Sequence, residues 1–317
     1  QRYAEQAVQK QMRTIQQRFN NHWGSQSPWR DERGQEIPDF IEDIAKRSEY
    51  YKILDEKFDG NADSIDYYMN QPHSVKVFDY NSQDHLVEKE MSTMDSIRYM
   101  VKFMHCGFVA MEPQTSYVRA WVGDVDFSSW KYDKVTAMRQ PGSTFKLFVY
   151  ASAFEHDDAI TPTTRYRDQL ISLQVPDAQD PQRLVTWTPH NSGGYCTGAN
   201  MPLKSAFAQS VNTIAVKLGQ DTGIDNVVDI AHKMGVESKL EATPSLALGS
   251  SDVNLLELVD AYCTAMNDGK QRKPILVTKI LDRNGEVIYD CERDEPEAKA
   301  VIRYKTAFYL QRLLYGG

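Results

Sequence analysis

One segment of this chain constrains its fold more than any other. Residues 143–154, Ser-Thr-Phe-Lys-Leu-Phe-Val-Tyr-Ala-Ser-Ala-Phe, follow a Pro-Gly pair and are apolar on nearly every face of a helix. A helix without a polar face belongs in the interior, so other elements must surround it. Ser143 stands at its start, a position that serine favours. With 317 residues, the chain is long enough for one large domain or two ordinary ones around that helix.

The rest of the chain divides into an N-terminal helical part and a mixed part. Apolar residues recur at steps of three and four from Ala4 to Phe19, which predicts an amphipathic helix over residues 1–20. Residues 21–100 are polar and aromatic with several turn signals, and short helices fit them. Later patterns predict a β-hairpin over 107–122, helices over 202–219, 223–235, 254–266 and 304–315, and two short strands within 274–289. We therefore expect a mixed α/β (α+β) fold.

Composition excludes several classes of protein. The net charge is 36 − 44 = −8, which argues against a nucleic-acid partner, because nucleic-acid binders carry a basic face. The four cysteines are scattered, and neither a Cys-x-x-Cys nor a His-Glu-x-x-His motif occurs. We therefore expect no disulfide scaffold, no metal site and no cofactor.

The termini and the hydropathy pattern bear on where the protein works. No run of 18 apolar residues is present, so no membrane-spanning helix is expected within the sequence. The first five residues, Gln-Arg-Tyr-Ala-Glu, are polar and lack an initiator Met. This start predicts a fragment or processed form, with any anchor or export signal lying upstream.

Ser143 and Lys146 are the first candidates for chemistry. Three residues apart on a helix, they share one face with Cβ atoms about 5–6 Å apart, so the amine can accept the proton of a nucleophilic hydroxyl. Burial would lower the pKa of Lys146, because it disfavours the charged amine. The helix N-terminus would direct N–H groups and the positive end of the dipole toward a developing oxyanion.

The Ser-x-x-Lys pattern alone is weak, because Ser128 and Lys131 form a second copy. No apolar helix follows that copy and two aspartates flank it, so we expect it to be solvent-exposed. Ser210-Val211-Asn212 is a more specific signal, since it is the only Ser-x-Asn here and interrupts an apolar helical pattern. A Ser and an Asn on a turn between helices can relay protons and hold a substrate amide. The alternative is an ordinary helix cap, which both residue types favour.

Together, the motifs at 143–146 and 210–212 resemble the signature of the penicilloyl-serine transferase superfamily, whose third motif is Lys-Thr-Gly. Residues 139–146, Arg-Gln-Pro-Gly-Ser-Thr-Phe-Lys, look like the nucleophile motif of class A penicillin-binding proteins. Residues 187–191, Trp-Thr-Pro-His-Asn, and the segments 120–133 and 245–262 are similar to other parts of that family. The N-terminal helix is similar to the segment that follows the glycosyltransferase domain in Bacteroidetes-type members.

The resemblance implies a β-lactamase/transpeptidase-like fold, with an antiparallel sheet flanked by helices and a central helical cluster. It implies a penicillin-binding transpeptidase domain over 105–317 and a linker or accessory region over 1–104, preceded by a glycosyltransferase domain. Ser143 would be the acylated nucleophile, Lys146 its base, and Ser210 with Asn212 the second motif. The 317 residues contain no Lys-Thr-Gly. Because the family places that motif after the helix that ends here at Gly317, we expect it and its strand beyond the C-terminus.

The implied activity is that of a peptidoglycan DD-transpeptidase in cell-wall synthesis. It would attack the D-Ala-D-Ala bond of one stem peptide, release D-Ala and pass the acyl group to an amine of a second stem peptide. Donor and acceptor stem peptides, β-lactam antibiotics and cell-wall synthesis regulators are the implied partners. The implied location is the periplasm, with an N-terminal anchor in the inner membrane. A DD-carboxypeptidase, a serine β-lactamase and a non-catalytic β-lactam sensor or scaffold are the alternatives.

Overall fold

The computed structural model describes residues 1–316 except 32, 83, 178, 179 and 181. Contacts within the chain divide it into two compact units. Unit 1 comprises Gln1–Gly107 and Val122–Lys134, and unit 2 comprises Phe108–Trp121 and Val135–Gly317.

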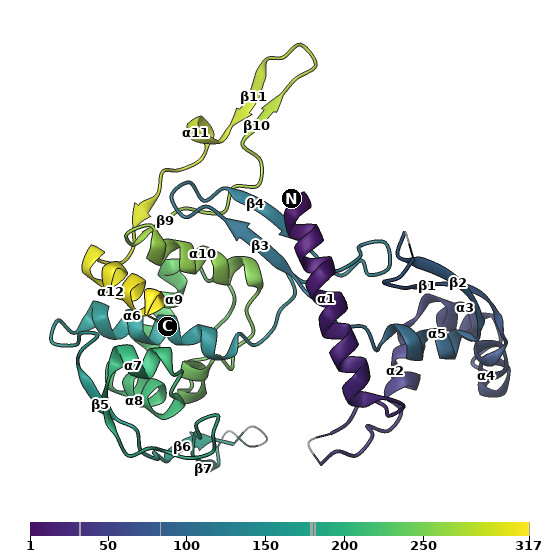
Figure 1. Ribbon diagram of the computed structural model, residues 1–317, viewed down its shortest axis with the longest axis horizontal. Helices are drawn as coiled ribbons and strands as arrows, with labels where there is room; N and C mark the ends of the chain where they lie inside the picture. Colours follow the sequence, from purple (N-terminus) through teal and green to yellow (C-terminus); the bar gives the residue numbers. More distant parts are fainter. Residues whose placement is uncertain (32, 83, 178–179, 181, 317) are drawn as a thin grey trace. The chain divides into compact units, whose positions relative to one another are not determined.

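Unit 1 consists of one long helix, several short helices and a β-hairpin (Figure 1). Val8 and Met12 of the long helix pack against Phe78 and Val125, and a separate cluster joins the short helices through Ile41 and other side chains. The helix predicted over 1–20 is thus confirmed. The elements are α1 (Arg2–Trp23), α2 (Phe40–Arg47), α3 (Glu49–Lys57), α4 (Ala62–Asn70), β1 (His73–Phe78), β2 (Leu86–Met91) and α5 (Thr93–Met100).

The β1–β2 hairpin was not predicted, since the sequence of residues 21–100 indicated only that short helices fit there. The two strands pair antiparallel over six residues each, from His73 opposite Met91 to Phe78 opposite Leu86. Only the last two residues of β1 are buried. With so short a buried stretch, the alternation of apolar and polar residues is too weak to indicate a strand.

Unit 2 contains the apolar helix and most of the strands. Its elements are β3 (Phe108–Met111), β4 (Val118–Val122), η1 (Gly142–Phe145), α6 (Lys146–His156), β5 (Arg165–Arg167), β6 (Leu173–Pro176), β7 (Leu184–Trp187), β8 (Asn200–Pro202), α7 (Leu203–Ala208), α8 (Asn212–Thr222), α9 (Ile224–Met234), η2 (Pro244–Leu248), α10 (Leu255–Met266), β9 (Lys270–Gln271), β10 (Lys279–Leu281), β11 (Val287–Asp290), α11 (Cys291–Asp294), β12 (Lys299–Ala300) and α12 (Tyr304–Tyr315).

Helix α6 is the centre of unit 2. Every residue from Lys146 to Phe154 is buried, and α8, α9 and α12 pack around it (Figure 1). Each fully buried Leu, Val or Phe contributes roughly 1.5–3 kcal/mol relative to its exposed state, so the sequence of α6 favours an interior position strongly. The prediction of a central helix is confirmed, with one refinement. The segment opens as the 3-10 turn η1, and the α-helix proper begins at Lys146.

The strands of the described residues form six two-stranded sheets. The predicted hairpin over 107–122 is β3 with β4, and it packs against α10. Tyr117, between these strands, forms a parallel bridge with Ile275. The strands predicted within 274–289 are the antiparallel pair β10–β11. The four helices predicted beyond residue 200 are found as α7 with α8, α9, α10 and α12, and the mixed α/β class is confirmed. Within the described part of the chain, no helix has the length and apolar character that crossing a membrane requires.

Candidate active site

Ser143 lies on the turn that leads into the buried helix. It is the second residue of η1, is exposed, and precedes Lys146 by three residues. Among the described residues its hydroxyl has no hydrogen-bond partner. The hydroxyl is therefore available to a molecule that approaches from solvent.

The segment formed by η2 and α10 supports this turn from one side. Arg139 and Val253 exchange two backbone hydrogen bonds of 3.0 Å each. The Tyr262 hydroxyl of α10 donates to the carbonyl oxygen of Thr144 at 2.8 Å. Backbone pairing before Ser143 and a side-chain bond after it fix the turn at both ends. This arrangement keeps an exposed nucleophile candidate on a rigid element.

Lys146 is buried beneath the turn, with 2% of its surface exposed. Its Nζ donates to the Ser210 carbonyl oxygen at 2.7 Å, to Ser210 Oγ at 3.0 Å and to Asn212 Oδ1 at 2.6 Å. No carboxylate pairs with the amine among the described residues. Burial therefore lowers the pKa of Lys146 to about 8, because nothing negative offsets the cost of desolvating the ammonium group.

Ser210 and Val211 lie in the turn between α7 and α8, and Asn212 is the first residue of α8, so the break in the helical pattern falls where the sequence predicted it. Ser210 has a φ of 53°, a left-handed conformation that residues other than glycine rarely adopt. The capping alternative holds in part. The backbone N–H groups of Val211 and Ser210 donate to the carbonyl oxygens of Ala206 and Phe207 at 2.9 Å each, so the positive φ of Ser210 closes the C-terminus of α7, whereas no side chain caps α8 at its N-cap, Val211. The hydrogen bonds that Ser210 Oγ and Asn212 Oδ1 accept from Lys146 join this turn to the buried amine.

The amide group of Asn212 has a defined orientation. Its Nδ2 donates to the carbonyl oxygen of His190 at 2.7 Å, so its Oδ1 is left to accept from Lys146. The segment 187–191 thus fixes the side chain of the second motif. Reasoning from the sequence singled out this segment only through its family resemblance and assigned it no role.

The structure brings three of the four predicted site residues into direct contact: Lys146, Ser210 and Asn212. Ser143 is the neighbouring fourth, but the hydrogen bonds of Lys146 go to the second motif and none goes to Ser143. Catalytic hydrogen bonds are often absent without substrate and form in the complex. The other Ser-x-x-Lys copy is exposed as expected, and the Ser128 hydroxyl donates to Asp126.

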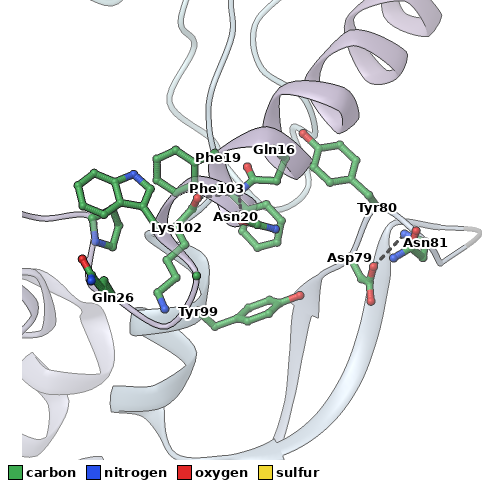
Figure 2. A pocket seen from close by; sticks show the side chains of 13 residues that line it. Gln16, Phe19, Asn20, Gln26, Asp79, Tyr80, Asn81, Tyr99, Lys102 and Phe103 are labelled. Atoms are coloured by element: carbon green, nitrogen blue, oxygen red, sulfur yellow. Dashed lines mark hydrogen bonds between the residues drawn. The ribbon is translucent and has the colours of Figure 1, made fainter.

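Unit 1 contains a separate hollow of about 380 Å³ (Figure 2). Side chains of α1, such as Phe19 and Asn20, and those of Tyr80, Tyr99 and Lys102 line it. None of the four predicted site residues lines this hollow. Over the described residues, no group of three or more His, Cys, Asp and Glu side chains is arranged to hold a metal ion.

Comparison with known proteins identifies two families along the chain. The penicillin binding protein transpeptidase domain matches residues 106–316, and the penicillin-binding protein middle domain matches residues 24–104. Penicillin-binding protein 2D of Bacillus subtilis is 34% identical over 211 residues, which are 66% of this chain and 29% of that protein. Penicillin-binding protein 1A of Rickettsia prowazekii is 36% identical over 190 residues, which are 60% of this chain and 23% of that protein.

A solved structure agrees with these matches. Penicillin-binding protein 1A from Haemophilus influenzae aligns with a TM-score of 0.59 and 25% identity, over 66% of this chain and 34% of that one. The chain spans less than a third of the length of the two curated relatives. The transpeptidase match nonetheless covers well over half of the chain and includes both motifs that meet at Lys146. The chain therefore belongs to the penicillin-binding protein transpeptidase domain family.

Proposed function

We propose that this chain is the acyl-transferring part of a peptidoglycan synthase and works through an acyl-serine at Ser143. The observation that carries the proposal is the amine of Lys146. It lies at the start of α6, three residues after the exposed Ser143, and is buried, with its pKa lowered to about 8. It donates to Ser210 Oγ and to Asn212 Oδ1. At pH 7 such an amine is neutral in about a tenth of the molecules, which is enough for a general base.

Acylation begins when the neutral Lys146 amine takes the proton of the Ser143 hydroxyl. The Ser143 Oγ attacks the carbonyl carbon between the two D-Ala residues of the donor stem peptide. As the tetrahedral intermediate collapses, the C–N bond breaks and the leaving D-Ala amine takes up a proton. Ser210 Oγ accepts a hydrogen bond from Lys146, so it can relay that proton.

Transfer is the reverse process with a different nucleophile. An amine of a second stem peptide attacks the acyl-serine, a new amide bond forms, and Ser143 leaves as the alcohol and regains its proton. Water in place of that amine would give a DD-carboxypeptidase. A β-lactam would acylate Ser143 in the same way and block it, and fast hydrolysis of that adduct would define a β-lactamase.

The remaining parts of the proposal concern the whole polypeptide. Residues 1–104 would be an accessory region between the domain over 105–317 and an upstream glycosyltransferase domain. The site would face the periplasm, with an anchor in the inner membrane before Gln1. The family match supports peptidoglycan stem peptides as substrates and β-lactams as inhibitors. Regulators of cell-wall synthesis would act on the intact protein.

Mass spectrometry of the full-length polypeptide after β-lactam treatment tests the assignment. The adduct should lie on the tryptic peptide 140–146, which contains Ser143. Ser143→Ala should abolish labelling, whereas Ser128→Ala, in the exposed copy of the motif, should leave it unchanged. An adduct on the peptide that carries Ser128 or Ser210 would refute the assignment. Cross-linked dimer, rather than hydrolysed tetrapeptide, should be the main product from a stem-peptide substrate.

A further inference from the structure

Asp168 is a buried carboxylate that the proposed chemistry does not use. It follows β5 directly and is 1% exposed. Its Oδ2 accepts hydrogen bonds from the backbone N and the hydroxyl of Thr197, both at 2.7 Å. Its Oδ1 accepts from Thr213 Oγ1 at 2.7 Å and from Asn191 Nδ2 at 2.9 Å. Across the described residues no cation pairs with it, so hydrogen bonds, chiefly these four, compensate for its burial.

The charge of Asp168 favours an orienting role over an acid–base role. Burial by itself raises the pKa of this carboxyl, but the hydrogen bonds from Thr197, Thr213 and Asn191 favour the ionised form more strongly and hold the pKa at about 2. The group therefore stays ionised at every pH at which a cell-wall enzyme works. A buried carboxylate that never changes its charge can act by orienting its donors.

One of those donors, Asn191, connects Asp168 to the start of α8. Because Asn191 Nδ2 donates to Asp168, its Oδ1 points the other way. That oxygen accepts from the backbone N of Asn212 at 2.9 Å and from the backbone N of Thr213 at 3.3 Å. These N–H groups belong to the first turn of a helix whose own N-cap, Val211, supplies no side-chain cap. Asn191 thus caps α8 from outside, and Asp168 holds Asn191 in the required orientation.

The second connection is direct. The Thr213 hydroxyl of α8 donates to Asp168, so both the backbone and a side chain of the first helical turn are tied to the carboxylate. The residue between Val211 and Thr213 is Asn212, whose Oδ1 accepts from Lys146. Both connections to Asp168 therefore restrain Asn212, the residue that contacts the Lys146 amine.

We propose that Asp168 is a positioning residue for acylation, which acts through Asn191 and Thr213 to hold Asn212 against Lys146. This inference rests on the proposed function. It predicts that loss of Asp168 impairs the chemistry in the same way as loss of the Asn212 side chain, and by no separate route.

The first test compares acylation by a fluorescent penicillin in the full-length polypeptide across pH. Asp168→Asn keeps the shape but replaces one acceptor oxygen with a donor that faces Thr197 or Thr213. We expect acylation to slow by about 10–10²-fold, the scale of misplacing a catalytic group. Because Asn212 Oδ1 stabilises the charged amine, its displacement should also move the acidic limb of the pH–rate profile down by about 0.5–1 pH unit. Asn212→Ala should move the limb in the same direction.

The double variant separates a positioning role from an independent one. If Asp168 acts through Asn212, then Asp168→Asn combined with Asn212→Ala should acylate within about twofold of Asn212→Ala alone. If the double variant instead slows acylation by the product of the two single-variant factors, the two residues act independently and the inference is overturned. A wild-type rate and an unmoved acidic limb in the single Asp168 variant would also overturn it.

A second pair of variants keeps the test decisive if Asp168→Asn fails to fold. Thr213→Val removes only the hydroxyl that donates to Asp168, and should reproduce the slower rate and the shifted limb. Thr213→Ser keeps that hydroxyl, so its acylation rate and the acidic limb of its pH–rate profile should match those of the wild type. Thr186→Val is the matched control, because its exposed hydroxyl accepts from Gln174 and lies outside the network. Equal behaviour of Thr213→Val and Thr186→Val would overturn the inference.

Failure of the inference can be told from failure of the proposed function. If the wild-type protein is not acylated at Ser143, the proposed function is refuted and the inference falls with it. If the wild type is acylated there and the Asp168 and Thr213 variants match it in rate and pH profile, only the inference is refuted.

Discussion

Gly249 packs so closely against Gly142 that a Cβ on Gly249 would lie 2.2 Å from the Gly142 carbonyl oxygen. No side chain fits at that distance, because the obstructing atom belongs to the backbone. Gly249 also has a φ of 75°, which only glycine adopts without strain. Since Gly142 directly precedes Ser143, this close approach sets the position of the turn that presents the proposed nucleophile.

Gly249→Ala should therefore damage both stability and acylation. The new methyl group must push η2 away from the turn that carries Ser143. We expect the free energy of unfolding to fall by more than the roughly 1 kcal/mol that a positive φ alone costs. Acylation by a fluorescent penicillin should slow about 10²-fold, because the Ser143 hydroxyl moves relative to Lys146, its proposed base.

Gly285→Ala is the matched control for that variant. Gly285 has a φ of 86°, but a Cβ there would meet no atom within 4 Å. Chemical denaturation should show only the conformational cost, and the acylation rate should stay at the wild-type value. Equal losses in both variants would show that the contact between Gly249 and Gly142 does not position the turn.

Lys146→Arg should nearly abolish acylation although it keeps the positive charge. A guanidinium holds its proton at neutral pH, so it cannot take the proton of Ser143. We expect acylation to slow at least about 10²-fold, the usual loss when a general base is removed. In the wild type the rate should rise with pH toward a plateau above about 8, because burial lowers the pKa of Lys146 to about 8 and the neutral amine is the active form.

The other Ser-x-x-Lys copy supplies a control for this substitution. Lys131 is exposed and lies over the ring of Phe127 in unit 1. Lys131→Arg should leave both the rate and its pH dependence unchanged. A Lys146→Arg protein that acylates at the wild-type rate would refute the role of the amine.

The elements that the sequence predicted well are those whose signal is local. The apolar run after Ser143 is continuous, so its burial as α6 could be predicted from residues 143–154 alone. The turn at Ser210 and Asn212 was predicted because it breaks an otherwise regular helical pattern. In both cases neighbours in the chain carry the physical signal.

The Asp168 network could not be predicted, because its partners are distant in the chain. Asp168 is 23 residues from Asn191 and 45 from Thr213. A lone aspartate after a three-residue strand carries no periodic or motif signal, and its burial depends on which loops fold over it. The contact of Lys146 with Ser210 and Asn212 could not be predicted either. The spacing in the sequence indicated only that the Lys146 amine lies close to Ser143.

Substitutions at Ser210 should separate its chemical role from its backbone strain. Ser210→Ala and Ser210→Gly both remove the Oγ that accepts from Lys146, so both should slow acylation, by about 10²-fold. Glycine adopts a positive φ freely, whereas alanine does not. The free energy of unfolding should therefore be about 1 kcal/mol higher for Ser210→Gly than for Ser210→Ala.

Thermal melts and labelling rates measured on the same samples check this prediction. Ser205→Ala, on α7, removes a serine hydroxyl outside the contact with Lys146 and should retain the wild-type rate. If Ser210→Gly acylates as fast as wild type, the hydroxyl takes no part in the chemistry. If Ser210→Gly is less stable than Ser210→Ala, the positive φ at Ser210 does not cost the folded state free energy as predicted.

The buried carboxyl group of Asp260 should make the stability of the protein depend on pH. It lies in α10 with 3% of its surface exposed, and its Oδ2 accepts from Gln271 Nε2 at 2.9 Å. The pKa of Asp260 is raised to about 7, mainly by burial. The hydrogen bond from Gln271 opposes this rise in the pKa, and the charge of Glu237 adds to it. An unfolded aspartate has a pKa of about 3.9. Between about pH 4 and 7 the folded protein thus holds a proton that the unfolded chain has released.

Stability should therefore fall as pH rises through that window, because the unfolded state binds fewer protons there. Asp260→Asn cannot ionise and keeps an oxygen for Gln271, so it avoids this loss. At pH 8 the variant should be more stable than wild type, by up to a few kcal/mol at about 1.4 kcal/mol per pKa unit. At pH 4 the difference should vanish. Denaturant titrations at both pH values measure it, with Asp252→Asn, at an exposed carboxylate, as the control. An equal effect of Asp260→Asn at pH 4 and pH 8 would contradict the raised pKa, since only ionisation distinguishes the two conditions.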